Sequence, residues 1–315
     1  MKLGVIMDPV SGINIKKDTT FAMMLAACAR GWELHYMEQG DLFVSAQRAW
    51  AATRIITVRD DKSGWYGFHG RQTLPLAELD AVLMRKDPPF DIEYVYTTYI
   101  LEYARNEGLL VVNDPSSLRD VNEKMYINNF PDCIAPTLVS RNHDQLTDFI
   151  REQGVAVLKP LEGMGGKSVF KVTAGDPNTN VIIETMTDSH RRFIMAQKYL
   201  PEIAQGDKRI ILVDGRPVDY ALARIPTPGE TRGNLAAGGS GKGVALGERD
   251  RWIAGRVGPA LRDKGLIFVG LDVIGDYLTE INVTSPTCVR ELEAIYDIDI
   301  AGQLMDTIES KLGKR

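Results

Sequence analysis

Residues 268–293 read FVGLDVIGDYLTEINVTSPTCVRELE, and the interpretation of the rest of the chain starts from this stretch. Apolar and polar residues alternate over Ile267–Ile274 and again over Leu278–Val283, which is the period of a half-buried β-strand. The Gly275-Asp276 pair between the two runs is typical of a tight turn. The sequence therefore predicts a β-hairpin.

The length of the hairpin loop decides which side chains of the two strands lie opposite one another. A two-residue loop would pair Asp272 with Thr279. A three-residue loop over Gly275–Tyr277 would instead place Asp272 opposite Glu280 and bring Asn282 to the same side. We favour the three-residue loop, because it collects the odd-numbered apolar residues on the buried face.

The predicted register brings two carboxylates and one amide together at Asp272, Glu280 and Asn282. Two carboxylates that face each other destabilise a sheet unless a cation lies between them. Oxygen ligands of this kind suit Mg²⁺, which keeps several waters and usually shares phosphate oxygens from a nucleotide. The alternative is a solvent-facing hairpin whose polar side carries acids. The Leu, Ile and Val residues around the acids favour the metal site.

Composition limits the class of protein. The chain has 315 residues, 44% of them apolar and 25% charged, which is ordinary for a globular protein of two or three domains. A net charge of -5 gives no positive field for nucleic acid. Three separated cysteines, at positions 28, 133 and 288, indicate neither a zinc site nor a disulfide framework, so we expect a cytoplasmic protein. No apolar run approaches the roughly 18 residues that span a bilayer, so we expect no membrane partner.

The order of the predicted elements gives an α/β fold with three domains. Strands and helices alternate over the first 115 residues or so, which predicts a doubly wound parallel sheet, and the lack of a GxGxxG motif argues against a dinucleotide fold. A helix is expected over Ser116–Phe130. We place the boundaries at residues 1–121 for an N-terminal α/β domain, 122–196 for an α+β block and 197–315 for a C-terminal domain with the hairpin.

A glycine-rich segment at Gly163–Lys167 joins two predicted strands. It is not a Walker loop, because residue 161 is leucine and the residues after Lys167 read as a strand rather than a helix. A glycine-rich tip can still lay backbone N–H groups over phosphates as a movable flap. A plain hairpin turn is the alternative. Lys159, which leaves an apolar strand just before the flap, is either a snorkelling side chain or a charge for a phosphate.

Two further stretches are candidates for ligand binding. Residues 195–200 read as a strand between domains whose exposed edge could bind an adenine ring, although an ordinary strand is the alternative. Residues 224–243 hold six glycines and two prolines. A segment this long without structure is usually functional, so we expect a lid that carries Arg232, with Arg224 at its base and Arg209 nearby, rather than a plain surface loop.

The sequence contains no GxSxG or HExxH motif, and its four histidines have no catalytic partners nearby. A chain without a covalent nucleophile fits phosphoryl transfer, in which positioning and electrostatics carry the catalysis.

Long runs of the chain resemble the bacterial glutathione synthetases, which are ATP-grasp carboxylate–amine ligases. The resemblance covers nearly the whole length, and the most specific runs are KLGVIMDP, LMRKDPPFD, VNDPSSLRDVNEK, LKPLEGMGGKSVF, ARIPTPGETRGNLAAGG and GLIFVGLDVIGDYLTEINVTSPTCVRE. It implies a two-subdomain ATP-grasp fold after the N-terminal domain. It also implies ligation of γ-glutamylcysteine to glycine through an acyl phosphate, giving glutathione, ADP and phosphate.

The resemblance implies roles for the residues singled out above. ATP is the co-substrate, Mg²⁺ is the metal with Mn²⁺ as an alternative ion, and the assembly is a homotetramer. For the nucleotide, the resemblance implies that adenine lies at Gln197, Lys198, Tyr199 and Leu200, that the ribose lies at Asp207, and that Lys124 and Lys159 bind the phosphates under Gly163, Gly165 and Gly166. It implies that the metal ion is bound by Asp272, Glu280 and Asn282. It further implies that Arg209, Arg224 and Arg232 are catalytic, with a lid over 225–243, and that Arg85 and Asp87 bind substrate.

Two alternatives stay open at this point. One is another ATP-grasp ligase, such as a D-alanine–D-alanine or glutamate-adding enzyme, which would share Lys159, the flap and the hairpin. The other is a nucleotide-binding regulator without turnover, and the intact set of two acids and one amide argues against it.

Overall fold

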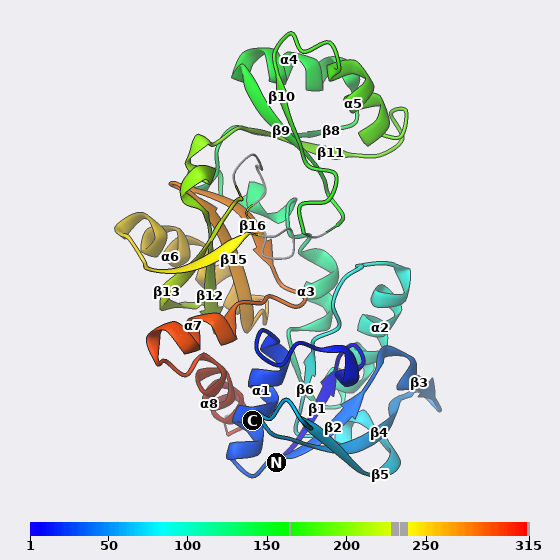
Figure 1. The fold of residues 1–315 in the computed structure, drawn as a ribbon. Coiled ribbons are helices and arrows are strands. Elements are labelled where there is room, and N and C mark those ends of the chain that lie inside the picture. Colours follow the sequence, from blue (N-terminus) through cyan, green and yellow to red (C-terminus); the bar gives the residue numbers. More distant parts are fainter. Residues whose placement is uncertain (164, 228–232, 234–238, 314–315) are drawn as a thin grey trace.

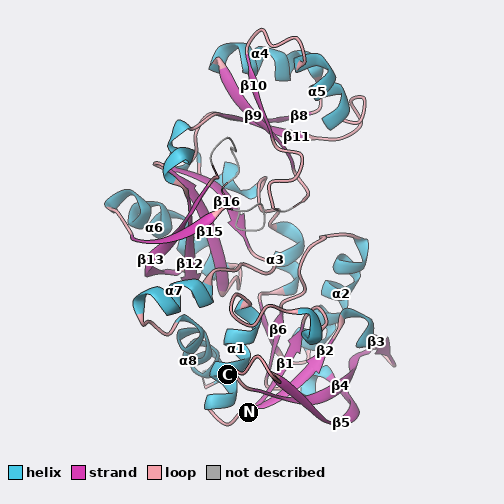
Figure 2. Ribbon diagram, viewed as in Figure 1, coloured by secondary structure: helices cyan, strands magenta, loops and turns pink. Residues whose placement is uncertain are grey.

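Three β-sheets follow one another along the molecule in the computed structural model, which describes residues 1–163, 165–227, 233 and 239–313 (Figure 1). Each sheet carries helices on its faces (Figure 2). No helix in these ranges is long and apolar enough to cross a membrane.

The first sheet has a parallel centre and an antiparallel edge. The parallel strands lie in the order β2-β1-β6-β7, and β3 and β5 pair with β4 at the antiparallel edge. The predicted doubly wound sheet is confirmed, and antiparallel strands extend it at one edge. The strands are β1 (Lys2–Ile6), β2 (Glu33–Met37), β3 (Leu42–Ser45), β4 (Arg48–Val58), β5 (Tyr66–Pro75), β6 (Ala81–Met84) and β7 (Leu110–Val112).

Two helices cover opposite faces of the first sheet. The carboxylate of Asp18 caps α1 (Thr19–Ala29) by accepting from the N–H of Phe21 at 2.6 Å. Asp91 caps α2 (Ile92–Asn106) in the same way. The helix expected over 116–130 is wrong: α3 (Pro115–Asp120) is short, because the side chain of Asn122 accepts from backbone N–H groups and forms a local turn instead.

The second sheet forms a small unit with its own core. Its strands lie in the order β10-β9-β11-β8, and helices α4 and α5 pack on it. The boundary predicted between residues 196 and 197 falls inside β11, which continues to Lys198. The elements are β8 (Thr137–Ser140), α4 (His143–Gln153), β9 (Val155–Pro160), β10 (Phe170–Thr173), α5 (Thr179–Met186) and β11 (Ile194–Lys198).

The third sheet contains the hairpin and is antiparallel, in the order β14-β13-β12-β15-β16. After it the chain returns to the first domain, where α8 packs against α1 and Arg30 bridges to Asp306 at 2.7 Å. The elements are β12 (Asp207–Val213), β13 (Arg216–Ile225), β14 (Ser240–Ala245), α6 (Glu248–Asp263), β15 (Phe268–Ile274), β16 (Tyr277–Asn282), α7 (Val289–Tyr296) and α8 (Ile300–Leu312).

The hairpin has the predicted pairing, but its loop is shorter than predicted and one strand contains a β-bulge. Asp272 lies opposite Glu280, as expected. The loop has two residues rather than three, because Ile274 pairs with Tyr277. The register then shifts at Thr279, which supplies the extra residue as a β-bulge and donates a hydrogen bond to the Asp272 carbonyl at 3.1 Å.

Candidate active site

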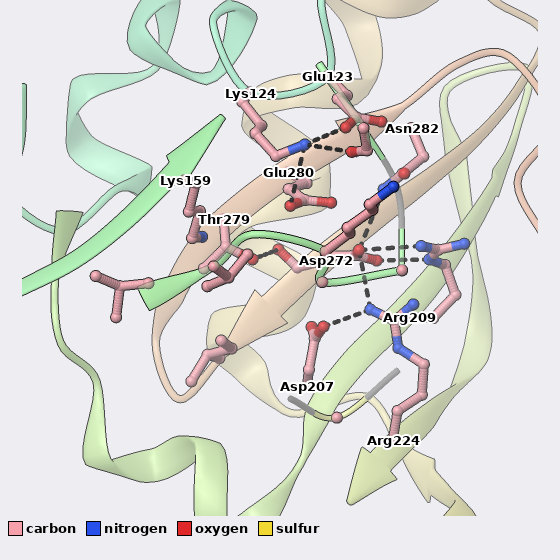
Figure 3. A pocket seen from close by; sticks show the side chains of 18 of the residues that line it. Glu123, Lys124, Lys159, Asp207, Arg209, Arg224, Asp272, Thr279, Glu280 and Asn282 are labelled. Carbon is pink, nitrogen blue, oxygen red and sulfur yellow. Dashed lines mark hydrogen bonds and ion pairs between the residues drawn. The ribbon is translucent and has the colours of Figure 1, made fainter. Parts of the chain in front are cut away.

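A cavity with a volume of about 310 Å³ lies between the second and third sheets, within the usual size range of ligand pockets (Figure 3). Most of the residues predicted for the site line this cavity, although they come from distant parts of the chain. They are Lys124, Lys159, Gly163, Gly165, Gly166, Gln197, Lys198, Tyr199, Leu200, Asp207, Arg209, Arg224, Asp272, Glu280, Asn282 and Asp87.

Asp272 is the centre of a buried ion-pair network on the third sheet. Its carboxylate accepts from Arg209 Nε at 2.5 Å and from Arg224 at 2.9 Å. Burial alone would raise the pKa of Asp272, but the two arginines hold it well below its usual value. Asp272 is therefore ionised at neutral pH.

Asp207 faces the same arginine from the neighbouring strand. Arg224 bridges Asp207 and Asp272, with a contact of 2.5 Å to Asp207. Burial, together with the carboxylates of Asp272 and Glu280, raises the pKa of Asp207 to about 6 despite this contact. One oxygen of Asp207 is buried and accepts no hydrogen bond from the residues that the structure describes, so it can accept from a ligand hydroxyl.

Lys124 reaches the hairpin from the segment before the second sheet. Its ammonium lies 3.7 Å from Glu280, donates to the Gly163 carbonyl at 3.1 Å and contacts the carboxylate of Glu123. This lysine and the two arginines supply the positive charge that lets Asp272 and Glu280 face each other. The prediction assigned that task to a metal ion alone.

Glu123 is a site residue that the sequence reasoning did not identify. Its carboxylate lines the cavity, and its carbonyl accepts from the N–H of Ile281 at 2.8 Å, which ties this segment to β16. Burial raises the pKa of Glu123 to about 7, and the nearby Glu280 adds to this shift. The sequence feature that points to Glu123 as a site residue is its position directly before Lys124.

The second sheet contributes lysines with neutral partners. Lys159 donates to Gln197 Oε1 at 3.0 Å, and it makes no ion pair with any residue that the structure describes. Lys171 lies 4.0 Å from the centre of the Tyr199 ring. Burial lowers the pKa of Lys159, so this charge is poorly compensated until an anion arrives.

The flap between β9 and β10 has the backbone of a glycine-rich turn. Gly163, Gly165 and Gly166 all have positive φ, at 106°, 70° and 72°, a region that other residues rarely adopt. All three line the cavity. Residue 164 lies outside the described part of the chain.

The predicted adenine segment lies at the cavity, but its strand is not an exposed edge. β11 pairs with β8 on one side and β9 on the other, so its backbone groups are engaged. The N–H of Tyr199 also donates to the Val155 carbonyl at 3.1 Å. The expectation of a free strand edge is therefore wrong, although Gln197–Leu200 still lines the cavity.

Arg85 differs from its predicted place. It is almost fully buried and donates to Thr20 Oγ1 at 3.1 Å and to the Pro286 carbonyl at 2.9 Å, rather than lining the cavity. It therefore holds the segment Thr284–Cys288, which does line the cavity and was also missed from sequence. The sequence feature that points to this segment is the run of small polar residues directly after the hairpin.

Arg232 and most of the predicted lid lie outside the described residues. Gly233 is described, is buried and lines the cavity. The lid predicted over 225–243 is too long, because Ile225 of β13 pairs with Ser240 of β14 and residues 240–243 belong to that strand.

Two sheets that enclose one cavity lined by lysines, arginines and acids define the class of the protein, an ATP-grasp enzyme. The D-cycloserine synthetase DcsG is similar over 99% of this chain and 100% of its own, with a TM-score of 0.69 and 14% identity. The ATP-grasp ligase PsnB, complexed with a minimal precursor, Mg and ADP, has a TM-score of 0.63 and 15% identity over 99% of this chain and 98% of its own. These likenesses show the fold.

Closer relatives give the family. The model of the prokaryotic glutathione synthetase N-terminal domain matches residues 1–119, and that of its ATP-grasp domain matches residues 123–297. The glutathione synthetase of Pseudomonas putida is 60% identical over 100% of this chain and 99% of its own, and that of Yersinia pestis is 59% identical over the same shares. The chain belongs to the prokaryotic glutathione synthetase family. The predicted family, ATP-grasp fold and ligase activity are confirmed.

Proposed function

We propose that the chain joins γ-glutamylcysteine to glycine at the expense of ATP, with Mg²⁺ bound at the hairpin. The observation that carries the proposal is the single cavity in which basic groups for a triphosphate, an acid–acid–amide set and paired arginines meet. Family membership points to the same reaction.

The nucleotide occupies the space between the two sheets. Adenine lies against Gln197–Leu200, and the unpartnered oxygen of Asp207 accepts from a ribose hydroxyl. Lys124 and Lys159 bind phosphates, since both ammonium groups line the cavity beneath the glycine flap. The poorly compensated charge of Lys159 favours an anionic ligand.

The hairpin residues fit a hard cation that takes the rest of its ligands from phosphate and water. Asp272 and Glu280 are direct cross-strand neighbours, and Asn282 lies within 3.2 Å of Asp272. The described residues hold no cluster of three acidic, histidine or cysteine side chains able to hold a metal by themselves. Such a sparse oxygen set suits Mg²⁺, which would neutralise charge on the phosphates.

The arginines act on the acid being activated. An oxygen of the dipeptide's terminal carboxylate attacks the γ-phosphorus of ATP, and ADP leaves. The amine of glycine then attacks the acyl carbon, loses a proton and releases phosphate. Arg209 and Arg224, with Arg232 on the lid, stabilise the charge that develops in both steps. Asp87 binds substrate from the first domain, and Arg85 positions the segment Thr284–Cys288.

The remaining features are proposed on family resemblance. The protein works in the cytoplasm as a homotetramer on small-molecule substrates, and it binds neither nucleic acid nor membrane. The net charge of -5 agrees with the lack of a nucleic-acid partner.

A phosphate-release assay tests the function. Purified protein with ATP, Mg²⁺, γ-glutamylcysteine and glycine should release phosphate, and omission of either amino substrate should stop the release. Silence with this pair but turnover with D-alanine would favour a D-alanine ligase instead. Tight ATP binding without phosphate release from any amine would favour a regulator.

A further inference from the structure

The side chain of Gln197 lies between two partners in the wall of the cavity. Gln197 is on β11, the strand between β8 and β9 in the second sheet (Figure 1). Its direct partner on β8 is Thr137. On the other side, Lys159 of β9 pairs with Met195, which shares the sheet face of Gln197. The three polar side chains therefore form one row across the sheet, and Gln197, at 2% exposed, lines the cavity.

Hydrogen bonds on both sides decide how the Gln197 amide is oriented. Lys159 donates to Oε1 at 3.0 Å, and an ammonium group can only donate. On the other side Nε2 donates to Thr137 Oγ1 at 3.1 Å. Thr137 donates its single hydroxyl hydrogen to the Ala135 carbonyl at 2.8 Å, so its oxygen can only accept from Gln197. The amide oxygen therefore points to the lysine, and the amide nitrogen points to the threonine.

A turned amide would lose its hydrogen bonds at both ends. Its NH₂ group would lie against the ammonium of Lys159, so two donors would face each other. Its oxygen would lie against a hydroxyl that already donates to Ala135. Buried polar groups without partners are costly. The orientation of the amide is therefore set by its neighbours before a nucleotide binds.

Purine bases differ at the atom that would meet the amide oxygen. Among the described residues only Lys159 donates to Gln197 Oε1, so the second lone pair of this oxygen can accept from a ligand in the cavity. Adenine carries an amino group at position 6, which donates, whereas a 6-oxo purine carries an oxygen there, which accepts. Two acceptors that face each other leave their lone pairs unpaired. An acceptor held in this place selects a 6-amino purine.

We propose that Thr137 is a positioning residue that sets the base specificity of the nucleotide site, because it holds the Gln197 amide with its oxygen available to the base. Thr137 is not among the residues that line the cavity, so it acts through Gln197 and not through contact with the nucleotide. The inference rests on the proposed location of adenine at Gln197–Leu200. It goes further in assigning the discrimination between bases to a residue behind the cavity wall.

Thr137→Val tests the proposal with ATP and inosine triphosphate (ITP), in which an oxygen replaces the 6-amino group and N1 carries a hydrogen. Valine favours a strand as threonine does, so β8 should be kept. Without the hydroxyl, a turned amide loses only its bond to Lys159. The ratio of the ITP to the ATP dissociation constant, measured by calorimetric titration, should therefore fall about fivefold, which corresponds to one hydrogen bond. Turnover at saturating ATP should stay within about twofold of the wild type.

Further variants show whether the effect passes through the hydroxyl and the amide. Thr137→Ala, which also lacks the hydroxyl, should give the same fall, and Thr137→Ser should keep the wild-type ratio. A carboxylate has no donor to turn toward the base, so in a Gln197→Glu background Thr137→Val should leave the ratio unchanged. Thr173→Val, which removes an exposed hydroxyl from β10 of the same sheet, is the matched control and should change neither dissociation constant.

The outcomes separate this inference from the proposed reaction. An unchanged ratio in Thr137→Val and Thr137→Ala would overturn the role of Thr137, and so would an equal fall in Thr137→Ser or in the Gln197→Glu background. A wild type that binds ITP as tightly as ATP would overturn it as well, even if the protein releases phosphate with γ-glutamylcysteine and glycine. A wild type that binds neither nucleotide would overturn the proposed function and this inference with it.

Discussion

The two walls of the cavity hold their charges in opposite ways. On the third sheet the charges are paired before any ligand binds, since Asp272 and Asp207 both contact Arg224. On the second sheet Lys159 donates to the neutral Gln197 and has no opposite charge paired with it in the described part of the chain. Side chains in a buried ion pair hold each other in place, whereas a buried charge without an opposite partner is stabilised when an anion binds. We propose that one wall is preorganised for the acid that reacts, and that the other wall responds to the nucleotide.

The largest expected effect concerns the paired wall and its candidate metal site. Glu280→Gln should reduce phosphate release by about 100-fold or more, because it weakens a cation ligand. The fold should stay intact, since the change relieves repulsion with Asp272. The measurement is phosphate release over a range of Mg²⁺ concentrations together with thermal unfolding. Asp276→Asn, an exposed acid in the same hairpin, is the control and should keep full activity.

Removal of an arginine should show that this wall also supports the fold. Arg209→Met takes away two hydrogen bonds to the buried Asp272 and leaves Arg224 as its remaining charged partner among the described residues, beside the amide of Asn282. The free energy of unfolding should fall by about 3 kcal/mol, since breaking a buried pair leaves a charge poorly compensated. Urea denaturation of the ligand-free protein measures this loss. A stability equal to the wild type would mean that the pairs are not fixed before ligands bind.

Lys159→Met should have the opposite pattern on the second sheet. The folded protein lowers the pKa of Lys159, so the charge costs stability without a ligand, and its removal should leave the ligand-free protein at least as stable as the wild type. ATP affinity should fall by roughly tenfold through loss of a phosphate contact. Calorimetric titration with ATP and a thermal melt give the two values. A clear loss of ligand-free stability would show that Lys159, like the arginines of the third sheet, stabilises the fold before a ligand binds.

The smallest expected effect is a pH dependence that Glu123 contributes. Its pKa rises from 4.5 to about 7 on folding, so the folded state binds more protons than the unfolded state between these values. The contribution to stability is therefore complete below about pH 4.5 and is lost as the pH rises to 7. Glu123→Gln should flatten the curve of unfolding free energy by about 1 kcal/mol per pH unit between pH 5 and 7. A stability curve identical to that of the wild type would show that a group other than Glu123 binds the proton.

Periodicity and resemblance predicted the hairpin, the cavity residues and the family, because these features depend on local patterns. The opposition of Asp272 and Glu280 followed from strand alternation, while the β-bulge at Thr279 did not, since nothing in the local sequence marks an inserted residue. Arg85 was misplaced because its partner, Pro286, is 201 residues away. Contacts of this kind depend on how the domains pack against each other, which cannot be read from the spacing of residues along the chain.

The return of the chain to its beginning has a consequence for synthesis. The outer face of α1 is covered by α8, with Arg30 bound to Asp306 and to the Gly302 carbonyl. Residues 300–312 are translated long after α1, so the first domain is made early but keeps an apolar face of α1 uncovered until α8 has been made. We expect a nascent chain to be prone to aggregation at this face until residues 300–312 are made, and a premature stop before residue 300 to expose the same face permanently.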